Sequence, residues 1–301
     1  MWWLVAMALG QTVEAPEDAV VHTEDAHRFM QALQLHESGV PLRRALVQEY
    51  RRPASVGLRD FWRINIRGVG RLSAQVQSGY AYYSKLGPEL EAVEARKAQI
   101  TSVFEELERQ YPPAVHPDVY VVVGRLNSGG TLTDRGLLIG LDMLGRDTGV
   151  VFPEGSWLDR ELKSADFFEV IVAHEMVHYQ QNQRDQPSVL AKCLVEGIAD
   201  FVSERLTGRT INQTAQDYGR AHEVEIWQRF QQEMLGRDTG NWLYRRPRVE
   251  GWPQDLGYFV GYRIAEAHFA QASSDEQGLT ALFTWTDAQA FLAESGYAPG
   301  P

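Results

Sequence analysis

The sequence has 301 residues, of which 44% are apolar and 23% charged, a balance typical of a folded chain that excludes global disorder and a multispan membrane protein. Its 40 acidic residues outnumber 29 basic ones, and the net charge of −11 argues against a nucleic-acid binder. The single cysteine, Cys193, excludes an internal disulfide and a cysteine-rich zinc finger. Any metal site must therefore be built from His, Asp and Glu.

An apolar run occupies residues 1–10 and is too short to cross a bilayer. Its length and its small-x-small end, Ala8-Leu9-Gly10, match the apolar core of a signal peptide, although no Lys or Arg precedes it. The alternative is a buried N-terminal strand. We expect an exported protein, periplasmic or secreted, and a cytoplasmic one if the run is not a signal. No cysteine follows the run, so a lipid anchor at that point is not supported. We also expect no transmembrane anchor.

Helices are predicted through most of residues 20–115. Apolar side chains recur at spacings of three and four over residues 24–51, and a turn at residues 37–41 divides this stretch into two helices. A longer amphipathic helix is expected over residues 87–110, where Pro112 and Pro113 stop it. These residues form the predicted helical N-terminal region.

A small sheet is predicted next. Residues 119–123 and 137–141 are expected strands, residues 127–130 a turn, and residues 149–153 a possible third strand. Helical periodicity then returns to the end of the chain. This segregated order predicts an α+β fold, mostly helical with a small mixed sheet. Residues 116–295 would form a catalytic region, or one continuous domain with the N-terminal helices.

The most informative pattern is His174-Glu175-x-x-His178, inside an apolar run that follows the candidate helix caps Ser164 and Asp166. Residues four apart share a helix face, so the two imidazoles offer zinc two nitrogen ligands. Glu175 lies about 100° around the helix, where a general base could reach a metal-bound water. The alternative is a group of polar side chains on a wet helix face.

A second apolar helix is expected over residues 189–208, with the glycine at its end as the C-cap. Glu196 and Asp200 lie four apart on one face of it, and two acids in so apolar a helix need partners. Glu196 is the expected third zinc ligand, and Asp200 the expected acceptor of the His174 ring N–H. The alternative is salt bridges to nearby basic residues, namely Lys192, Arg205 or Arg209.

Together the two helices resemble a known family. His-Glu-x-x-His followed by Glu-x-x-x-Asp on the next helix resembles the signature of the gluzincin metallopeptidases, the thermolysin-like clan. Seventeen residues separate His178 from Glu196, slightly fewer than is usual in that clan. Both helices, and residues 124–140, are similar to the predicted bacterial zinc-dependent proteases related to the gliding-motility lipoproteins. The resemblance covers about residues 118–265.

This resemblance implies a zincin-like fold and a zinc hydrolase that holds one Zn²⁺ per chain through His174, His178 and Glu196. It also implies that Glu175 is the general base and that Asp200 lies behind the ligands. The substrate would be a peptide or protein, whose amide a metal-activated water attacks. Whether cleavage is internal or terminal, and how many subunits assemble, stay open.

Amide hydrolysis also needs a hydrogen-bond donor for the oxyanion. Tyr258 opens an apolar helix over residues 255–269 and is the expected donor, with Tyr262 and Arg263 as further candidates. The alternative is that these residues are half-buried aromatic side chains and an ion-paired arginine.

Residues 137–141 are the expected edge strand of the clan architecture, to which a substrate peptide would add through main-chain hydrogen bonds. These substrate-binding residues are Leu137, Leu138, Ile139, Gly140 and Leu141. The alternative is a plain core strand.

Two other features are expected to be structural. Arginine clusters at residues 43–52 and 245–248 are expected to be solvated or ion-paired, and Cys193 to be a small buried apolar residue. The sequence therefore predicts a zinc metallopeptidase. The alternative is a catalytically inactive, zinc-stabilised protein of envelope binding or assembly that keeps the site without turnover.

Overall fold

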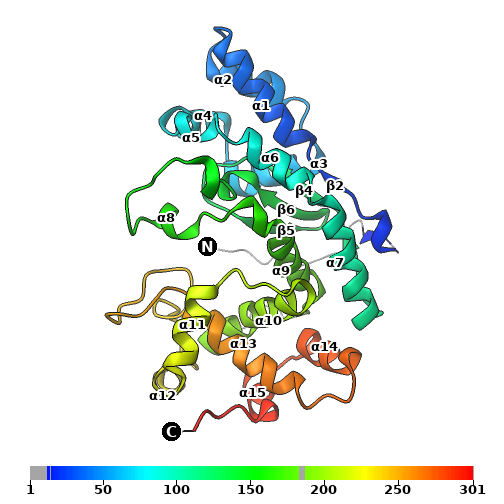
Figure 1. The fold of residues 1–301 in the computed structure, drawn as a ribbon, viewed down its shortest axis with the longest axis vertical. Helices are drawn as coiled ribbons and strands as arrows, with labels where there is room; N and C mark the ends of the chain where they lie inside the picture. The colour runs from blue at the N-terminus through cyan, green and yellow to red at the C-terminus, as the bar shows by residue number, and fades with distance from the viewer. Residues whose placement is uncertain (1–11, 14, 183–186, 301) are drawn as a thin grey trace. The chain divides into compact units, whose positions relative to one another are not determined.

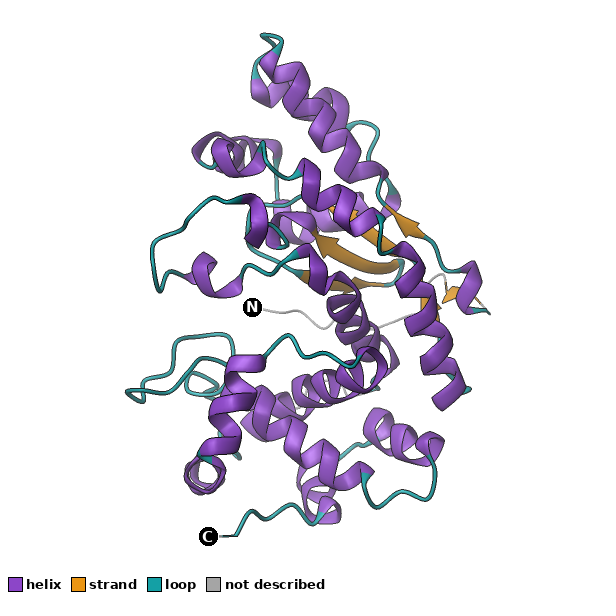
Figure 2. Cartoon of the chain, in the orientation of Figure 1, coloured by secondary structure: helices purple, strands orange, loops and turns teal. Residues whose placement is uncertain are grey.

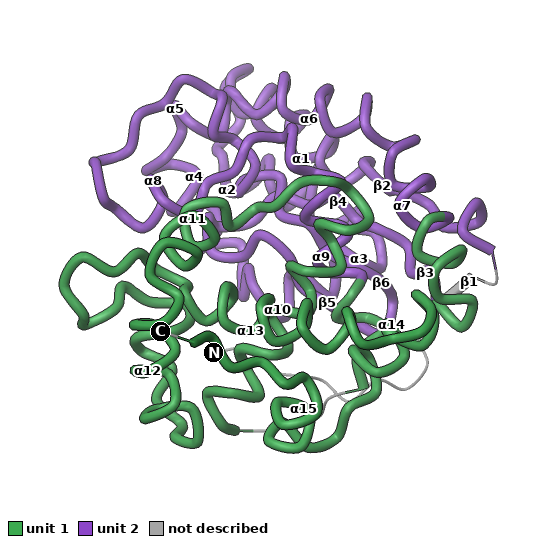
Figure 3. The backbone as a smooth tube through the Cα atoms, turned by 60° about the horizontal axis from the view of Figure 1, so that its bottom comes forward, with its two compact units in different colours: residues 1–4, 106–114, 177–301 green, residues 5–105, 115–176 purple. Residues whose placement is uncertain are grey.

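The computed structural model describes residues 12–13, 15–182 and 187–300, so the predicted signal at residues 1–10 lies outside the described residues. The chain forms two compact units (Figure 3). Of the described residues, 12–13, 15–105 and 115–176 form the N-terminal unit, and 106–114, 177–182 and 187–300 form the C-terminal unit. Residues 115–176 thus belong with the N-terminal helices, whereas the sequence suggests a division between residues 115 and 116.

The N-terminal unit contains a mixed four-stranded sheet in the order β2-β4-β6-β5 (Figures 1 and 2). The bounds of these strands are β2 Val21–His22, β4 Val119–Val122, β5 Gly130–Thr133 and β6 Gly136–Gly140. β4 is parallel to β2 and β6, and β5 is antiparallel to β6. Every residue of β4 and β6 is buried, as expected where both faces of a sheet are covered. A separate antiparallel pair joins β1 (Thr12–Val13) to β3 (His116–Pro117).

The expectation that residues 137–141 form an edge strand is wrong. β6 pairs with β4 on one side and with β5 on the other, so its main-chain groups are already used. Leu141 lies outside the strand, in the 3-10 turn Leu141–Met143. The possible third strand at residues 149–153 is also wrong, because Gly149 adopts a left-handed φ of 71° and Pro153 has no N–H to donate to a ladder.

Short helices surround the sheet in this unit. Their bounds are α1 Glu24–Glu37, α2 Leu42–Ala45, α3 Val56–Phe61, α4 Val69–Ser78, α5 Tyr80–Tyr83, α6 Gly87–Glu94 and α8 Trp157–Glu161. π-helical turns continue α2 as η2 (Leu46–Arg51) and α3 as η3 (Trp62–Ile66). α3 packs on β4 at Gly57, where a Cβ would lie 2.2 Å from the Tyr120 ring.

The predicted helix over residues 87–110 is two helices. α6 ends at Glu94, and α7 (Lys97–Gln110) begins after a tight turn that the Arg96 N–H closes on the Val93 carbonyl. The turn directs the Arg96 guanidinium to Asp166, with which it forms an ion pair and a hydrogen bond. The amphipathic pattern continues through residues 95–96, so the sequence does not signal the turn between α6 and α7.

Buried polar groups hold the carboxyl ends of β4 and β6. Asp142 is fully buried, and its two carboxylate oxygens accept hydrogen bonds from the main-chain N–H groups of Gly124 and Leu126, at 2.6 Å each. Tyr82 donates to the Asp142 carbonyl at 2.7 Å. Although the two N–H donors lower the pKa of the Asp142 carboxyl, burial outweighs them and raises it to about 6.

The C-terminal unit is built on α10 (Val189–Thr207) and α13 (Leu256–Phe269), which pack side by side (Figure 1). A Cβ on Gly197 would lie 2.2 Å from the Gly261 carbonyl carbon, and one on Gly261 would lie 1.8 Å from the Cys193 carbonyl oxygen. Cys193 itself is fully buried, as predicted. The other helices of the unit are α11 Gln213–Ala221, α12 Glu223–Glu233, α14 Asp275–Thr284 and α15 Ala288–Ser295.

The predicted ends of α10 are confirmed. Ser188 caps it by accepting the Ala191 N–H, and Gly208 ends it with a left-handed φ of 70°. α9 (Phe168–Gln180) and α7 each extend from one unit into the other. The fold is thus α+β and mostly helical, as predicted. Within the described residues, we find no helix with the length and apolarity needed to span a bilayer.

The contact between α10 and α13 leads to a stability prediction. Gly261→Ala places a methyl group against main-chain atoms that cannot rotate away, so we expect it to lower the free energy of unfolding by about 3 kcal/mol. Urea denaturation followed by tryptophan fluorescence measures the change. Gly70→Ala is the control, because a Cβ at helical Gly70 has no neighbour within 4 Å and should change stability by less than about 1 kcal/mol. Equal effects of the two substitutions would contradict the close contact.

Asp142 leads to a pH prediction. The folded state holds its proton at a pKa of about 6, against 3.8 ordinarily, so its contribution to stability is fully present below pH 3.8 and is lost as the pH rises through about 6. The stability advantage of wild type over Asp142→Asn should therefore shrink by about 3 kcal/mol between about pH 3.5 and 6.5. Urea denaturation of both proteins at each pH measures it, and a pH-independent difference would contradict the assignment.

Candidate metal centre

α9 carries both histidines of the predicted site. Ser164 begins this segment by accepting the Asp166 N–H in a short 3-10 turn, from which α9 continues. His174 is buried and His178, one turn later, is half-buried. Glu196 is half-buried on α10, as His178 is on α9.

The structure brings these three residues together. Ligand atoms of His174, His178 and Glu196 all lie within 4.8 Å of one another, and within the described residues they are the one such group of His, Cys, Asp and Glu side chains. His178 and Glu196 both belong to the C-terminal unit, where His178 Nε2 lies 3.5 Å from Glu196 Oε2. Two nitrogens and one carboxylate oxygen are a donor set that zinc takes in proteins.

Hydrogen bonds in the C-terminal unit set the tautomer of His178. The Gln181 amide nitrogen donates to the Val195 carbonyl at 3.0 Å, and this bond turns the amide oxygen toward His178. The oxygen accepts only, so it takes the His178 Nδ1–H at 2.8 Å. In the neutral imidazole, Nε2 then carries a lone pair and faces the Glu196 carboxylate.

This arrangement fits a metal ion. A lone pair and a carboxylate oxygen repel each other at 3.5 Å, and either a bound cation or a proton on Nε2 would relieve this repulsion. Two ligands about 2.1 Å from a tetrahedral zinc are about 3.4 Å apart, close to the separation found here. A nitrogen-to-oxygen distance of 3.5 Å is, by contrast, long for a direct hydrogen bond. The donor set and its spacing therefore suit zinc.

Tyr244 completes the surroundings of Glu196 and was missed by the sequence analysis. Its hydroxyl donates to Glu196 Oε1 at 2.7 Å, and the burial of this hydroxyl, followed by the negative charge of Glu196, raises the pKa of Tyr244 well above its ordinary value, although part of the side chain is exposed. Asp255 fixes the loop by accepting the Tyr244 N–H at 2.6 Å. Tyr244 and Asp255 both adopt positive φ, 66° and 65°, which no local sequence pattern signals.

Asp200 and Glu175 have other neighbours. Asp200 Oδ2 accepts a hydrogen bond from Asn212 at 2.6 Å, a partner that the sequence analysis also missed. The predicted bond from His174 to Asp200 stays a prediction. Glu175 is buried in the N-terminal unit, where Gly130 at the start of β5 makes room for it: a Cβ there would lie 2.1 Å from Glu175 Oε1.

The candidate oxyanion donors fit the alternative better. Arg263 forms ion pairs with Glu223 and Glu266, and Tyr262 packs edge-on against Phe201. Tyr258 is half-buried in the first turn of α13, and burial followed by the charge of Glu196 raises its pKa well above the ordinary value. The hydroxyl that the structure places on Glu196 is that of Tyr244.

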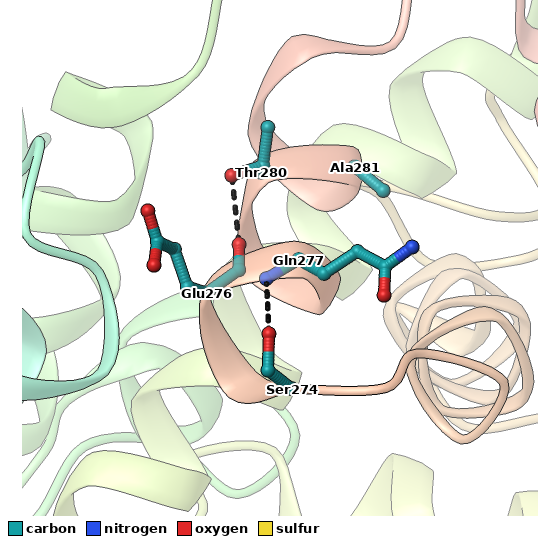
Figure 4. Close-up of a pocket in the computed structure, with 5 residues that line it drawn as sticks. All are labelled: Ser274, Glu276, Gln277, Thr280 and Ala281. Carbon is teal, nitrogen blue, oxygen red and sulfur yellow. Dashed lines mark hydrogen bonds between the residues drawn. The ribbon is translucent and has the colours of Figure 1, made fainter.

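Arg205 is not a partner of the two acids on α10. It pairs with Asp275 at 3.1 Å and lies over the Phe269 ring. Asp275 begins α14, along which a hollow is lined by Ser274, Glu276, Gln277, Thr280 and Ala281 (Figure 4). The two hydrogen bonds drawn there are the Ser274 cap accepting the Gln277 N–H and Thr280 donating to the Glu276 carbonyl. Both bonds are internal to α14 and its N-cap.

Comparison with known proteins identifies the family of the chain. It belongs to the family described as Gliding motility protein GldB, whose profile matches residues 23–299. No curated protein and no solved structure matches it.

The family corrects the enzymatic prediction. The match is to a gliding-motility lipoprotein family and not to a gluzincin peptidase family, so the assignment as a zinc metallopeptidase, a protease and hydrolase, is wrong. The catalytic roles of Glu175 and Tyr258, and the peptide substrate at residues 137–141, were tied to that assignment. The physical reason is that His-Glu-x-x-His specifies where two ligands lie on a helix; it does not specify turnover.

Proposed function

We propose that this chain is an exported, envelope-associated protein that acts by binding or assembly and not by hydrolysis, stabilised by one Zn²⁺ on His174, His178 and Glu196. Membership of a gliding-motility lipoprotein family supports the envelope setting. The donor set supports the metal. We also propose that α9 and α10 are paired through this site, as the two metal-binding helices of a zincin-like fold would be.

The observation that carries the metal proposal is the orientation of Gln181. Its amide gives the Val195 carbonyl a donor and the His178 Nδ1–H an acceptor, so His178 presents Nε2 to Glu196 as a ligand atom. An outer hydrogen bond of this kind fixes the ring and raises its basicity in known metal sites. Tyr244 does the same for the other side of Glu196 by holding Oε1 and leaving Oε2 toward His178.

In this proposal the zinc ion has a structural role. When bound, it would supply the positive charge that Glu196 faces and would link the end of α9 to α10. α10 is in turn locked to α13 at Gly197 and Gly261, so the link reaches the core of the C-terminal unit. Arg263, one of the groups expected to stabilise an oxyanion, is instead paired with two carboxylates.

Zinc content tests the proposal. The purified chain, saturated with zinc and dialysed, should retain about one zinc by elemental analysis, and His178→Ala should retain less than about a tenth of that. His222→Ala is the matched control, because His222 is exposed and its ring contacts Tyr218 in the same unit. The wild type should unfold at a lower temperature after zinc removal, whereas His178→Ala should not respond.

A second variant keeps the test decisive if His178→Ala fails to fold. Gln181→Leu keeps all three ligands and removes the bond that sets the tautomer, so zinc affinity measured by chelator competition should fall about 10–100-fold. A wild-type chain without metal under zinc-replete conditions would contradict the site and leave a protonated His178 paired with Glu196. Chelator-sensitive cleavage of peptides by the zinc-loaded chain, abolished in Glu175→Gln, would contradict the non-enzymatic role.

A further inference from the structure

The strongest feature outside the metal centre is a concentration of arginine between residues 42 and 72. This segment has two acidic residues, Glu49 and Asp60, and eight arginines, namely Arg43, Arg44, Arg51, Arg52, Arg59, Arg63, Arg67 and Arg71. It contains no lysine. Its formal charge is +6, which leaves −17 on the remainder of a chain whose total is −11. The charge of the protein is therefore strongly segregated.

The structure gathers these arginines on elements that pack together. α4 contacts α2 with η2 on one hand and η3, the continuation of α3, on the other, all within the N-terminal unit, where Figure 1 labels α2, α3 and α4. All eight arginines are exposed. Arg59 and Arg63 lie four apart along α3 and η3, so the helical path brings them to one side; Arg67 follows directly after η3 with a left-handed φ of 58°. We call this set the arginine surface.

Little of this charge is neutralised by the protein. Arg63 lies 3.7 Å from Asp60, and Arg51 lies over the Trp62 ring at 5.1 Å. Within the described residues, no carboxylate lies within ion-pair distance of Arg43, Arg44 or Arg52. Of the two expectations for residues 43–52, solvated or ion-paired, the structure shows the first. These three arginines are therefore solvated and available to an external anion.

We propose that the arginine surface docks on an anionic membrane surface. Each guanidinium presents paired N–H donors that match the oxygens of a lipid phosphate, which a lysine ammonium does not. The surrounding −17 is repelled by such a membrane, so the chain meets it with one face only. The proposal uses the envelope setting of the proposed function and is independent of the metal centre.

A lipid surface fits the arginine surface better than a protein partner does. Stable protein interfaces have a core of large apolar or aromatic side chains surrounded by polar residues. The exposed large apolar side chains of the described residues are Val20, Val151, Trp157, Leu235 and Tyr244. None of them lies between residues 42 and 72, where Trp62 is buried beneath Arg51. The arginine surface offers positive charge without an apolar anchor. Electrostatic binding to anionic lipid headgroups requires no apolar anchor.

Vesicle co-sedimentation of the full chain tests this proposal. With phosphatidylcholine vesicles that contain about one-third phosphatidylglycerol, the wild type should sediment at about 50 mM salt and be released at about 500 mM. Arg43→Gln, Arg44→Gln and Arg52→Gln combined should weaken binding at least about tenfold. The matched control is the triple variant of Arg237, Arg245 and Arg246 to Gln, which changes the net charge equally at exposed arginines of the C-terminal unit and should stay within about twofold of wild type.

Three outcomes would overturn the proposal. Equal sedimentation with pure phosphatidylcholine would show that charge is not recognised. Equal loss in both triple variants would show that net charge matters and the arginine surface does not. Retention on polyglutamate or DNA without sedimentation on vesicles would assign the surface to an acidic protein or to nucleic acid. The zinc content of the triple variants should equal that of wild type, so a failure here is distinct from a failure of the metal centre.

Discussion

The orientation of one amide, that of Gln181, determines the chemistry of the candidate metal centre. A carbonyl can only accept and an amide N–H can only donate, so the bond to Val195 leaves the amide oxygen for His178. The imidazole then has its proton on Nδ1 and its lone pair toward Glu196. Two half-buried acceptors that face each other are stabilised by a positive charge between them. The proposed metal thus rests on the polarity of a side chain that is not itself a ligand.

The hydrogen bonds from Val195 through Gln181 to His178 require a fixed position of α10 relative to the end of α9. The packing of α13 against α10 helps to fix that position. Gly197, the neighbour of Glu196, leaves α10 in main-chain contact with α13 at Gly261. A side chain at either glycine would push the helices apart. Asp255 directly precedes α13 and accepts the Tyr244 N–H. This bond positions the Tyr244 hydroxyl on Glu196. The close main-chain contact at Gly197 and Gly261 therefore helps to position the side chains of the candidate metal centre.

The sequence predicts the parts of this site that depend on local geometry. Helix periodicity alone pairs His174 with His178 and Glu196 with Asp200, and the two helices follow each other in the chain. Tyr244 and Asn212 were missed because their contacts depend on loops: Tyr244 reaches Glu196 over 48 residues, from a position with positive φ. The edge of the sheet was missed because β5 has only four residues and begins at Gly130, the last residue of the predicted turn.

The function was mispredicted for a different reason: a ligand motif constrains structure more than it constrains chemistry. Two histidines and a glutamate can bind zinc both in a site that activates a water and in a site that only joins two helices. Net charge is misleading in the same way. A total of −11 suggests avoidance of any anionic partner, yet it is the sum of a strongly acidic chain and one arginine-rich segment of +6. Because charges interact over about a Debye length, 8–10 Å at ordinary salt, a surface responds to its nearest charges and not to the total. A chain this acidic can therefore meet an anionic bilayer, provided that it turns the arginine surface toward it.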